Sequence, residues 1–429
     1  MHALQELIAR HKQGTACGVT SICSAHPIVV EASLRHALLH DDALLLFEAT
    51  CNQVNQDGGY TGMTPADFVG FVHGIARRVG YDTARIVLGG DHLGPNPWTA
   101  LDAAAAMDKA EAMVAAYVAA GFRKIHLDCS MACAGDPEPL PEAEIVRRAT
   151  RLCRAAEDAW KNSGGEAPVY VIGTEVPVPG GATESIEGLA VTTPEAALAT
   201  IAAHREAFAA AGLDAAWQRV IASVVQPGVE FDHHQVVDYA PDKARALSAA
   251  IAPVPGMVFE AHSTDYQTRD ALTALVRDHF AILKVGPGLT FALREALWAL
   301  DAIEREWIAP EAQARLRETA IARLHAEPKY WRRYYHAEGR QLDIDLQYSL
   351  SDRIRYYWPD PAIERAREAL FANLRANPPP LPLVGQYLPH ALRALREGRT
   401  DGDPLSLAMA HVGAVLDDYH HACHHHAQP

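Results

Sequence analysis

The chain has 429 residues, of which 49% are hydrophobic and 21% are charged. This composition is typical of a folded globular protein and excludes a disordered chain, a collagen and a coiled coil. The formal net charge is −15, and no basic segment is present that could neutralise a phosphodiester backbone, so nucleic acid is not an expected partner.

Neither a membrane span nor a signal peptide is predicted. No apolar run reaches the about 18 residues that a spanning helix needs, and the N-terminal MHALQELIARHK lacks the charged-then-apolar layout of a secretory signal. The seven cysteines form no C-x-x-C pair, which favours reduced thiols over disulfides or a structural zinc site. We therefore expect a soluble, cytoplasmic protein with no membrane partner.

Short runs rich in β-branched residues alternate with longer Ala-rich amphipathic segments through about residue 300. The predicted strands are 18–23, 43–49, 85–90, 124–128, 169–174, 220–225, 257–261 and 281–285. The predicted helices between them include 64–79, 100–120, 142–160, 194–211 and 242–252. Eight strand-then-helix units predict an α/β fold, a (β/α)8 TIM barrel over residues 1–300.

Residues 301–429 are predicted to form a helical C-terminal extension that packs on the barrel, because Arg, Glu and aromatic residues replace the strand patterns there. The NPPPLP stretch, Asn377 to Pro382, is predicted to be extended and non-helical, with a last helix around residues 405–420. The terminal HHACHHHAQP is interpreted as a flexible, solvated tail in which metal binding would be adventitious.

Polar residues follow every predicted strand, and the reactive groups of a barrel lie at the carboxyl ends of its strands. The main candidates are Glu48, Asp91, His92, Asp128, Glu175, Gln226, His262, Asp265 and Lys284. Helix capping and polar loops account for some of these positions. They do not account for buried-type runs such as VLGGDH, IHLDCS and VIGTEV, which deliver an acid directly from the sheet.

The sequence also predicts a metal site. His92, Glu175 and His262 follow the third, fifth and seventh predicted strands, and two imidazoles with one carboxylate suit Zn²⁺ or a similar divalent ion. Asp91, the neighbour of His92, is expected to point to a different side of the strand and to move protons. The alternative for each single histidine is a hydrogen-bonded core residue.

A glycine-rich run, KVGPGLT, follows the eighth predicted strand and precedes a helix. Barrels often bind phosphate at this position through backbone N–H groups. The predicted phosphate-binding residues are Lys284, Gly286, Gly288 and Thr290, with Arg353 and Arg355 of YSLSDRIRYYWP as a second contribution. A simple turn and surface ion pairs remain the alternatives.

These segments resemble the Z-subunit (GatZ/KbaZ) family of D-tagatose-1,6-bisphosphate aldolase over essentially the whole chain. The similarity lies in SICSAHP, EATCNQVNQDGGYTGMTP, GGDHLGPNPW, KIHLDCSMACAGDP, VIGTEVPVPGG, VVQPGVEFDH, EAHSTDYQT, LKVGPGLTFALREA and YSLSDRIRYYWP. The resemblance implies a (β/α)8 barrel and a role in galactitol or related ketose catabolism. It further implies three conflicting roles for family members: a non-catalytic partner of an aldolase, a tagatose-6-phosphate kinase, and a metal-dependent 4-epimerase.

The kinase activity is discounted because neither G-x-x-x-x-G-K-[ST] nor a kinase signature set is present. Catalytic class II aldolases are more distantly similar, and the resemblance then implies that Asp91 transfers protons and that His92 and His262 bind zinc. Gln226 stands where those relatives place a third zinc histidine, and Glu175 is the nearest replacement.

The resulting prediction is 4-epimerisation of tagatose or fructose, free or 6-phosphorylated, by a retro-aldol and aldol pair. Asp91 or Asp128 would move the C4 hydroxyl proton, and Glu48, Gln226 and Asp265 would bind the sugar. The expected cofactor is Zn²⁺, Mn²⁺, Ni²⁺ or Mg²⁺, with no nucleotide. The alternative is a non-catalytic subunit that stabilises a separate class II aldolase; a homo-oligomer is also compatible with the sequence.

Overall fold

Eight parallel strands close into a barrel in the computed structural model, which describes residues 2–173 and 189–424. In their order around the barrel the strands are β1 (Val19–Ile22), β2 (Leu45–Thr50), β3 (Ile86–Leu93), β4 (Lys124–Leu127), β5 (Val169–Ile172), β6 (Val220–Val225), β9 (Val258–Ala261) and β10 (Phe280–Val285). A separate antiparallel hairpin joins β7 (Glu230–Phe231) to β8 (Val236–Val237). The predicted barrel is confirmed, and each barrel strand overlaps a predicted one.

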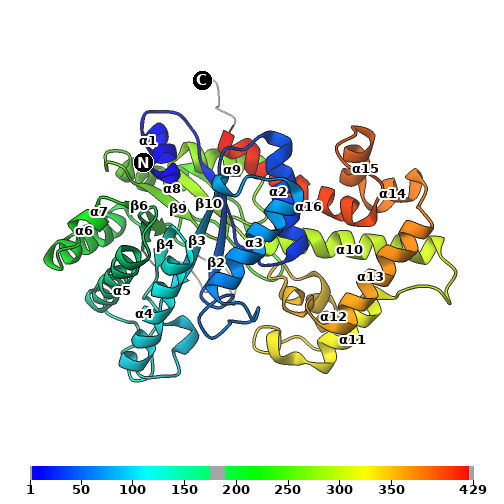
Figure 1. Cartoon of the computed structure of the whole chain (residues 1–429), viewed down its shortest axis with the longest axis horizontal. Helices are drawn as coiled ribbons and strands as arrows, with labels where there is room; N and C mark the ends of the chain where they lie inside the picture. The colour runs from blue at the N-terminus through cyan, green and yellow to red at the C-terminus, as the bar shows by residue number, and fades with distance from the viewer. Residues whose placement is uncertain (1, 174–188, 425–429) are drawn as a thin grey trace.

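Helices surround the barrel, as Figure 1 shows. They are α2 (Pro27–His40), α3 (Pro65–Val79), α4 (Ala103–Ala120), α5 (Glu142–Ser163), α6 (Pro194–Ala210), α7 (Asp214–Trp217), α8 (Pro241–Ile251) and α9 (Arg269–Arg277). Several begin at a side-chain cap: Thr64, Asp102, Thr193 and Thr268 each accept a hydrogen bond from a first-turn backbone N–H. These caps satisfy donors that a helix start leaves unpaired.

The N-terminal end of the barrel is apolar. Helix α1 (Ala3–Lys12) places Leu4, Leu7 and Ile8 in one buried cluster with barrel residues such as Leu46 and Val169. This end is therefore sealed by packing, and polar groups accumulate at the opposite end, where the strands finish.

The chain beyond β10 is helical. It contains α10 (Pro287–Trp307), α11 (Leu316–Ala326), α12 (Gly339–Tyr348), α13 (Pro361–Ala376), α14 (Leu381–Tyr387), α15 (Pro389–Arg396) and α16 (Pro404–His424). The last helix, α16, contacts α9, α2 and α10. It therefore lies in the ring of helices between α9, which follows the seventh barrel strand, and α2, which follows the first (Figure 1). Among the described residues, no helix has the length and apolar character to cross a membrane.

Two predictions for this region are wrong in detail. NPPPLP is not extended throughout, because α14 begins at Leu381 with Pro382 in its first turn, where proline lacks only an N–H that has no helical partner. The predicted flexible tail does not begin at His420, because residues 420–424 form the last turn of α16.

Candidate metal and substrate site

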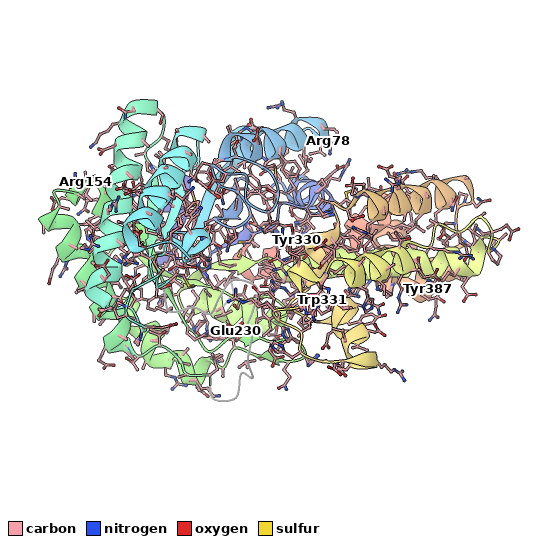
Figure 2. The ribbon with its side chains drawn as sticks, turned by 90° about the horizontal axis from the view of Figure 1, so that it is seen from below. Arg78, Arg154, Glu230, Tyr330, Trp331 and Tyr387 are labelled. Carbon is pink, nitrogen blue, oxygen red and sulfur yellow. The ribbon has the colours of Figure 1, made fainter. Side chains whose placement is uncertain are left out.

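A cavity of about 1240 Å³ opens at the carboxyl ends of the strands. Its lining includes Asp91, His92 and His262 from the barrel, and Tyr330 and Arg353 from the C-terminal helical part. Figure 2 shows Tyr330 at the junction between the barrel and the C-terminal helices, with Tyr387 at the far end of those helices. The two parts of the chain therefore build one cavity together.

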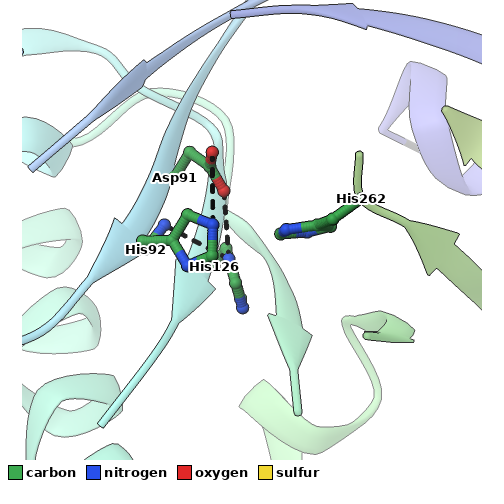
Figure 3. Close-up of side chains that lie close together, drawn as sticks. All are labelled: Asp91, His92, His126 and His262. Carbon is green, nitrogen blue, oxygen red and sulfur yellow. Dashed lines mark hydrogen bonds and ion pairs between the residues drawn. The ribbon is translucent and has the colours of Figure 1, made fainter. Parts of the chain in front are cut away.

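Four ionisable residues converge beside this cavity, and three of them, Asp91, His92 and His262, line it. Asp91, His92, His126 and His262 each offer a ligand atom, and these atoms all lie within 4.8 Å of one another. All four side chains are buried. Figure 3 shows that Asp91 and His92 come from β3 and His126 from the adjacent β4, while His262 approaches from the opposite side, after β9.

The conformation of β3 brings adjacent residues to the same cavity. The pairing of β3 with β4 shifts register between Gly90 and Leu93, and His92 has a φ of +48°. A bulge of this kind re-aims side chains, and a non-glycine residue in the left-handed region is strained backbone of the kind found at functional sites. The prediction that Asp91 and His92 point to different sides is therefore wrong, because both line the cavity.

Carboxylates orient two of the histidines. Asp128 Oδ2 lies 2.7 Å from His92 Nδ1, and Asp128 Oδ1 accepts hydrogen bonds from the N–H and the hydroxyl of Ser130. Glu260 Oε1 lies 3.0 Å from His262 Nε2. A carboxylate on one ring nitrogen fixes the ring and leaves the other nitrogen for a metal, which is the usual outer arrangement of metal-binding histidines.

Protonation favours the same role for His262. Burial, together with the charges of His92 and Lys284, lowers the pKa of His262 to about 3, although Glu260 acts in the opposite direction. The imidazole is then neutral near pH 7, which is the form that binds metal.

His126 has contacts at both ring nitrogens. Its Nδ1 lies 3.1 Å from Asp91 Oδ1 and accepts a hydrogen bond from the backbone N–H of His92, while Nε2 lies 3.1 Å from the carbonyl oxygen of Gly173. This residue locks β3 to β4 at the level of the cluster.

A buried charge network lies beneath the cluster. Lys284 Nζ is 2.6 Å from Asp91 Oδ1 and 3.0 Å from Glu48 Oε2. Lys124 Nζ is 2.7 Å from both Glu48 Oε1 and Glu260 Oε2. Burial opposes the charge of Lys284, but attraction to Asp91, Glu48 and Glu260 outweighs it and raises the pKa of this lysine, so Asp91 has a cationic neighbour.

The predicted phosphate loop already has an acceptor. Asp265 Oδ1 accepts hydrogen bonds from the backbone N–H groups of Gly286, at 2.9 Å, and Gly288, at 2.7 Å. Burial raises the pKa of Asp265 to about 6, although these N–H groups act in the opposite direction. Beside it, the hydroxyl of Thr290 donates to Asp352 Oδ2 at 2.5 Å.

Two arginines of the C-terminal part reach the same cavity. Arg353 Nε donates to the carbonyl of Tyr330 at 2.5 Å, and its guanidinium lies 3.2 Å from the ring centre of Tyr334. Arg355 donates to the carbonyl of Asp352 at 3.1 Å. Backbone bonds and aromatic stacking thus fix both guanidinium groups at the cavity wall.

The structure brings most of the predicted site residues together. Asp91, His92, His262, Asp265, Lys284, Gly286, Thr290, Arg353 and Arg355 line the one cavity. Three more predicted residues lie behind that lining, and each contacts a residue that lines the cavity. Asp128 contacts His92, Glu48 contacts Lys284, and Gly288 donates its backbone N–H to Asp265. Gln226 is not among the described residues that line this cavity, and its side-chain oxygen accepts the N–H groups of Gly228 and Val229. Glu175 lies outside the described residues, so its role stays a prediction.

His126 and Lys124 were not predicted. Both precede Asp128 at alternating positions of β4, and alternate residues of a strand face the same side. Since Asp128 faces the cluster, counting back by two along KIHLD would have placed His126 and Lys124 inside the barrel.

Comparisons with known proteins agree with this architecture. The family model described as D-tagatose-1,6-bisphosphate aldolase subunit GatZ/KbaZ-like matches residues 4–424. The D-tagatose-1,6-bisphosphate aldolase subunit GatZ of Klebsiella pneumoniae is 53% identical over 420 residues, which cover 98% of this chain and 99% of the relative. The crystal structure of a probable tagatose 6 phosphate kinase from Sinorhizobium meliloti is 51% identical, with a TM-score of 0.87 over 95% of this chain and 100% of that one.

Proposed function

The chain belongs to the D-tagatose-1,6-bisphosphate aldolase subunit GatZ/KbaZ-like family, and from this membership we propose that it is a metal-dependent 4-epimerase of a ketohexose or its 6-phosphate, interconverting tagatose and fructose. The observation that carries the proposal is the convergence of ligand atoms of Asp91, His92, His126 and His262 within 4.8 Å, with Asp91, His92 and His262 lining a large cavity.

The donor set fits a divalent metal. Imidazole nitrogens are ligands that Zn²⁺ and similar ions accept, and Asp128 and Glu260 fix the rings of His92 and His262. His92 and His262 would hold the metal through the ring nitrogens that do not face Asp128 and Glu260, and the metal would supply Lewis-acid polarisation of the substrate's C2 carbonyl; His126, whose ring nitrogens contact the His92 N–H and the Gly173 carbonyl, positions β3 beside it. Glu175 is retained as a further proposed ligand.

The chain's own residues supply the proton transfer. Tagatose and fructose differ only in the configuration at C4. Asp91, which lines the cavity, accepts the proton of the C4 hydroxyl as the C3–C4 bond breaks, giving an aldehyde and an enediolate. The aldehyde turns, the C3–C4 bond re-forms on its other face, and Asp91 returns the proton to the C4 oxygen, so no atom or electron is gained or lost.

Lys284 keeps the carboxyl group of Asp91 ionised, which is the form that accepts a proton. Its Nζ lies 2.6 Å from Asp91 Oδ1, and burial, which would favour the neutral acid, is outweighed by His92 and Lys284, so the pKa of Asp91 lies well below its ordinary value. Asp128 is assigned a positioning role instead of proton transfer, because it lies behind the cavity lining with its oxygens bonded to His92 and Ser130.

The proposal is tested with the purified chain alone, supplied separately with Zn²⁺, Mn²⁺, Ni²⁺ or Mg²⁺ and with tagatose or fructose, free and 6-phosphorylated. We expect tagatose and fructose to interconvert, either as the free sugars or as the 6-phosphates. Deuterium placed at C4 should be retained, because the C4–H bond does not break in a retro-aldol route. His262→Ala should lose the metal ion of the barrel site, one ion per chain, and turnover together. The matched control is His325→Ala, which removes a half-exposed histidine paired with Asp343; full turnover by His262→Ala would refute the assignment.

The second candidate is a subunit that supports a separate class II tagatose-1,6-bisphosphate aldolase. It is favoured by the name of the Klebsiella relative, which is called a subunit of that enzyme. If the chain alone converts none of the four sugars, but increases the activity or stability of an added class II aldolase, this candidate replaces the first.

A further inference from the structure

A second group of metal-binding side chains lies outside the cavity, between α2 and α16. Helix α2 carries His36 and His40, and α16 carries His420 and His424. Each pair is spaced i,i+4, which puts both rings on one face of the helix. The two helices pack against each other, and the rings of His40 and His420 approach to 4.2 Å between centres.

One aspartate completes each half of this α2–α16 histidine cluster. Asp417 Oδ1, on α16, lies 2.9 Å from His36 Nε2 and 3.5 Å from His40 Nε2. Asp42 Oδ1, just beyond α2, lies 3.2 Å from His420 Nδ1 and 3.8 Å from His424 Nε2. Each aspartate therefore comes from the helix region opposite its histidines, so both groups join α2 to α16.

These separations match a tetrahedral metal centre. Bonds of about 2.0–2.1 Å at tetrahedral angles put neighbouring ligand atoms about 3.3 Å apart. In each group of three, the donor atoms all lie within 4.8 Å of one another. His424 Nδ1 also lies 3.1 Å from the carbonyl oxygen of His420, which assigns the ring proton to Nδ1 and leaves Nε2 as the ligand nitrogen.

We propose that the α2–α16 histidine cluster binds divalent transition metal of the zinc class, one ion at His36, His40 and Asp417 and one at Asp42, His420 and His424. The ions connect the C-terminal helix to the first helix of the barrel. A simple set of ion pairs would need several protonated imidazoles side by side, whereas a metal uses neutral rings and balances the two carboxylates.

The α2–α16 histidine cluster is also connected to the wall of the cavity at the strand ends. Tyr419, the neighbour of His420 on α16, donates its hydroxyl to the backbone carbonyl of Thr264 at 2.8 Å. Thr264 lies two residues beyond His262 in the loop after β9 and donates to the carbonyl of Lys284 at 2.6 Å. Fixing α16 therefore fixes the loop that carries His262.

The experiment measures bound Zn²⁺ per chain by equilibrium dialysis of metal-stripped full-length protein, at increasing Zn²⁺ concentration. His36→Ala/His40→Ala and His420→Ala/His424→Ala should each lose one ion relative to the unmodified chain, with affinity at that site reduced at least tenfold. The matched control is His234→Ala/His325→Ala, which removes two histidines that each pair with one aspartate elsewhere and should keep every ion.

Two further arms make the result decisive. A chain ending at His424 removes His425 and His426 of the sequence; if it loses the ions, the terminal residues bind them and the proposal fails. The proposal also fails if both double variants bind as many ions as the unmodified chain. Should an alanine variant not fold, the glutamine pair His36→Gln/His40→Gln gives the same measurement, and Zn²⁺ should raise Tm less in either variant than in the control.

Discussion

Lys124 provides the sharpest test of how the barrel interior is held together. This lysine is fully buried, and its ammonium lies 2.7 Å from both Glu48 Oε1 and Glu260 Oε2. Burial opposes its charge, but attraction to Glu260 and Glu48 outweighs that effect and raises its pKa. Lys124→Met keeps most of the side-chain volume and removes the charge, leaving three carboxylates, those of Glu48, Glu260 and Asp91, on the single ammonium of Lys284.

The expected loss follows from this imbalance. Breaking a buried ion pair by removing one partner typically costs about 3–5 kcal/mol, because the other charge stays buried and uncompensated. An unfolding entropy of about 2.1 cal/mol/K per residue amounts to about 0.9 kcal/mol/K over 429 residues. Lys124→Met should therefore lower Tm by about 3–6 °C.

The assay is thermal and urea-induced unfolding, followed by circular dichroism, of a double-mutant cycle with Glu260→Gln. In the unmodified chain, Glu260→Gln leaves Lys124 short of a partner, whereas in Lys124→Met it removes an excess carboxylate. The second substitution should thus cost at least about 1 kcal/mol less in the Lys124→Met background. Equal costs in both backgrounds, or a Tm change below about 1 °C for Lys124→Met, would refute the account of the network.

Three further outcomes are expected. Asp128→Asn should weaken metal affinity of the barrel site about 10–100-fold with little change in Tm, measured by isothermal titration, because the ring of His92 loses its orienting carboxylate. Burial raises the pKa of Asp352 from 3.8 to about 7, so the folded chain binds the extra proton and the unfolding free energy falls as pH rises from 3.8 to about 7, by up to about 1.4 kcal/mol per pH unit; Asp352→Asn should flatten that slope in urea titrations. Tyr419→Phe should cost about 1–3 kcal/mol in the same titrations, because the buried carbonyl of Thr264 loses its donor.

Local pattern was sufficient to predict the barrel. The strand over residues 220–225 has the bounds that its β-branched run predicts, and α3, predicted over 64–79, spans Pro65–Val79. These features depend on a few neighbouring residues. The position of α16 between α9 and α2 could not be predicted in this way. It depends on packing between segments more than a hundred residues apart, and hydrophobic periodicity within a segment carries no information about such packing.

The candidate site was predictable to the extent that a strand end defines a place in a barrel. Asp91, His92 and His262 follow strands, and the cavity contains all three. The directions of side chains were less predictable: the left-handed conformation of His92 turns both it and Asp91 inward, against simple alternation. His126 lies within β4, and a single histidine in a buried strand is usually interpreted as a core residue. Only its spacing of two residues from Asp128 indicated that it faces the site.

The loop after β10 changes where a phosphate group would have to bind. Its sequence predicts free amides, but the amides of Gly286 and Gly288 already donate to the buried carboxylate of Asp265. A phosphate at this place would have to displace that carboxylate or bind beside its charge. The guanidinium groups of Arg353 and Arg355 line the same cavity, and within residues 2–173 and 189–424 no acidic side chain bonds to their nitrogens. For a phosphorylated substrate we therefore propose that these arginines of the C-terminal part recognise the phosphate, while the loop uses its amides to hold Asp265 in the cavity wall.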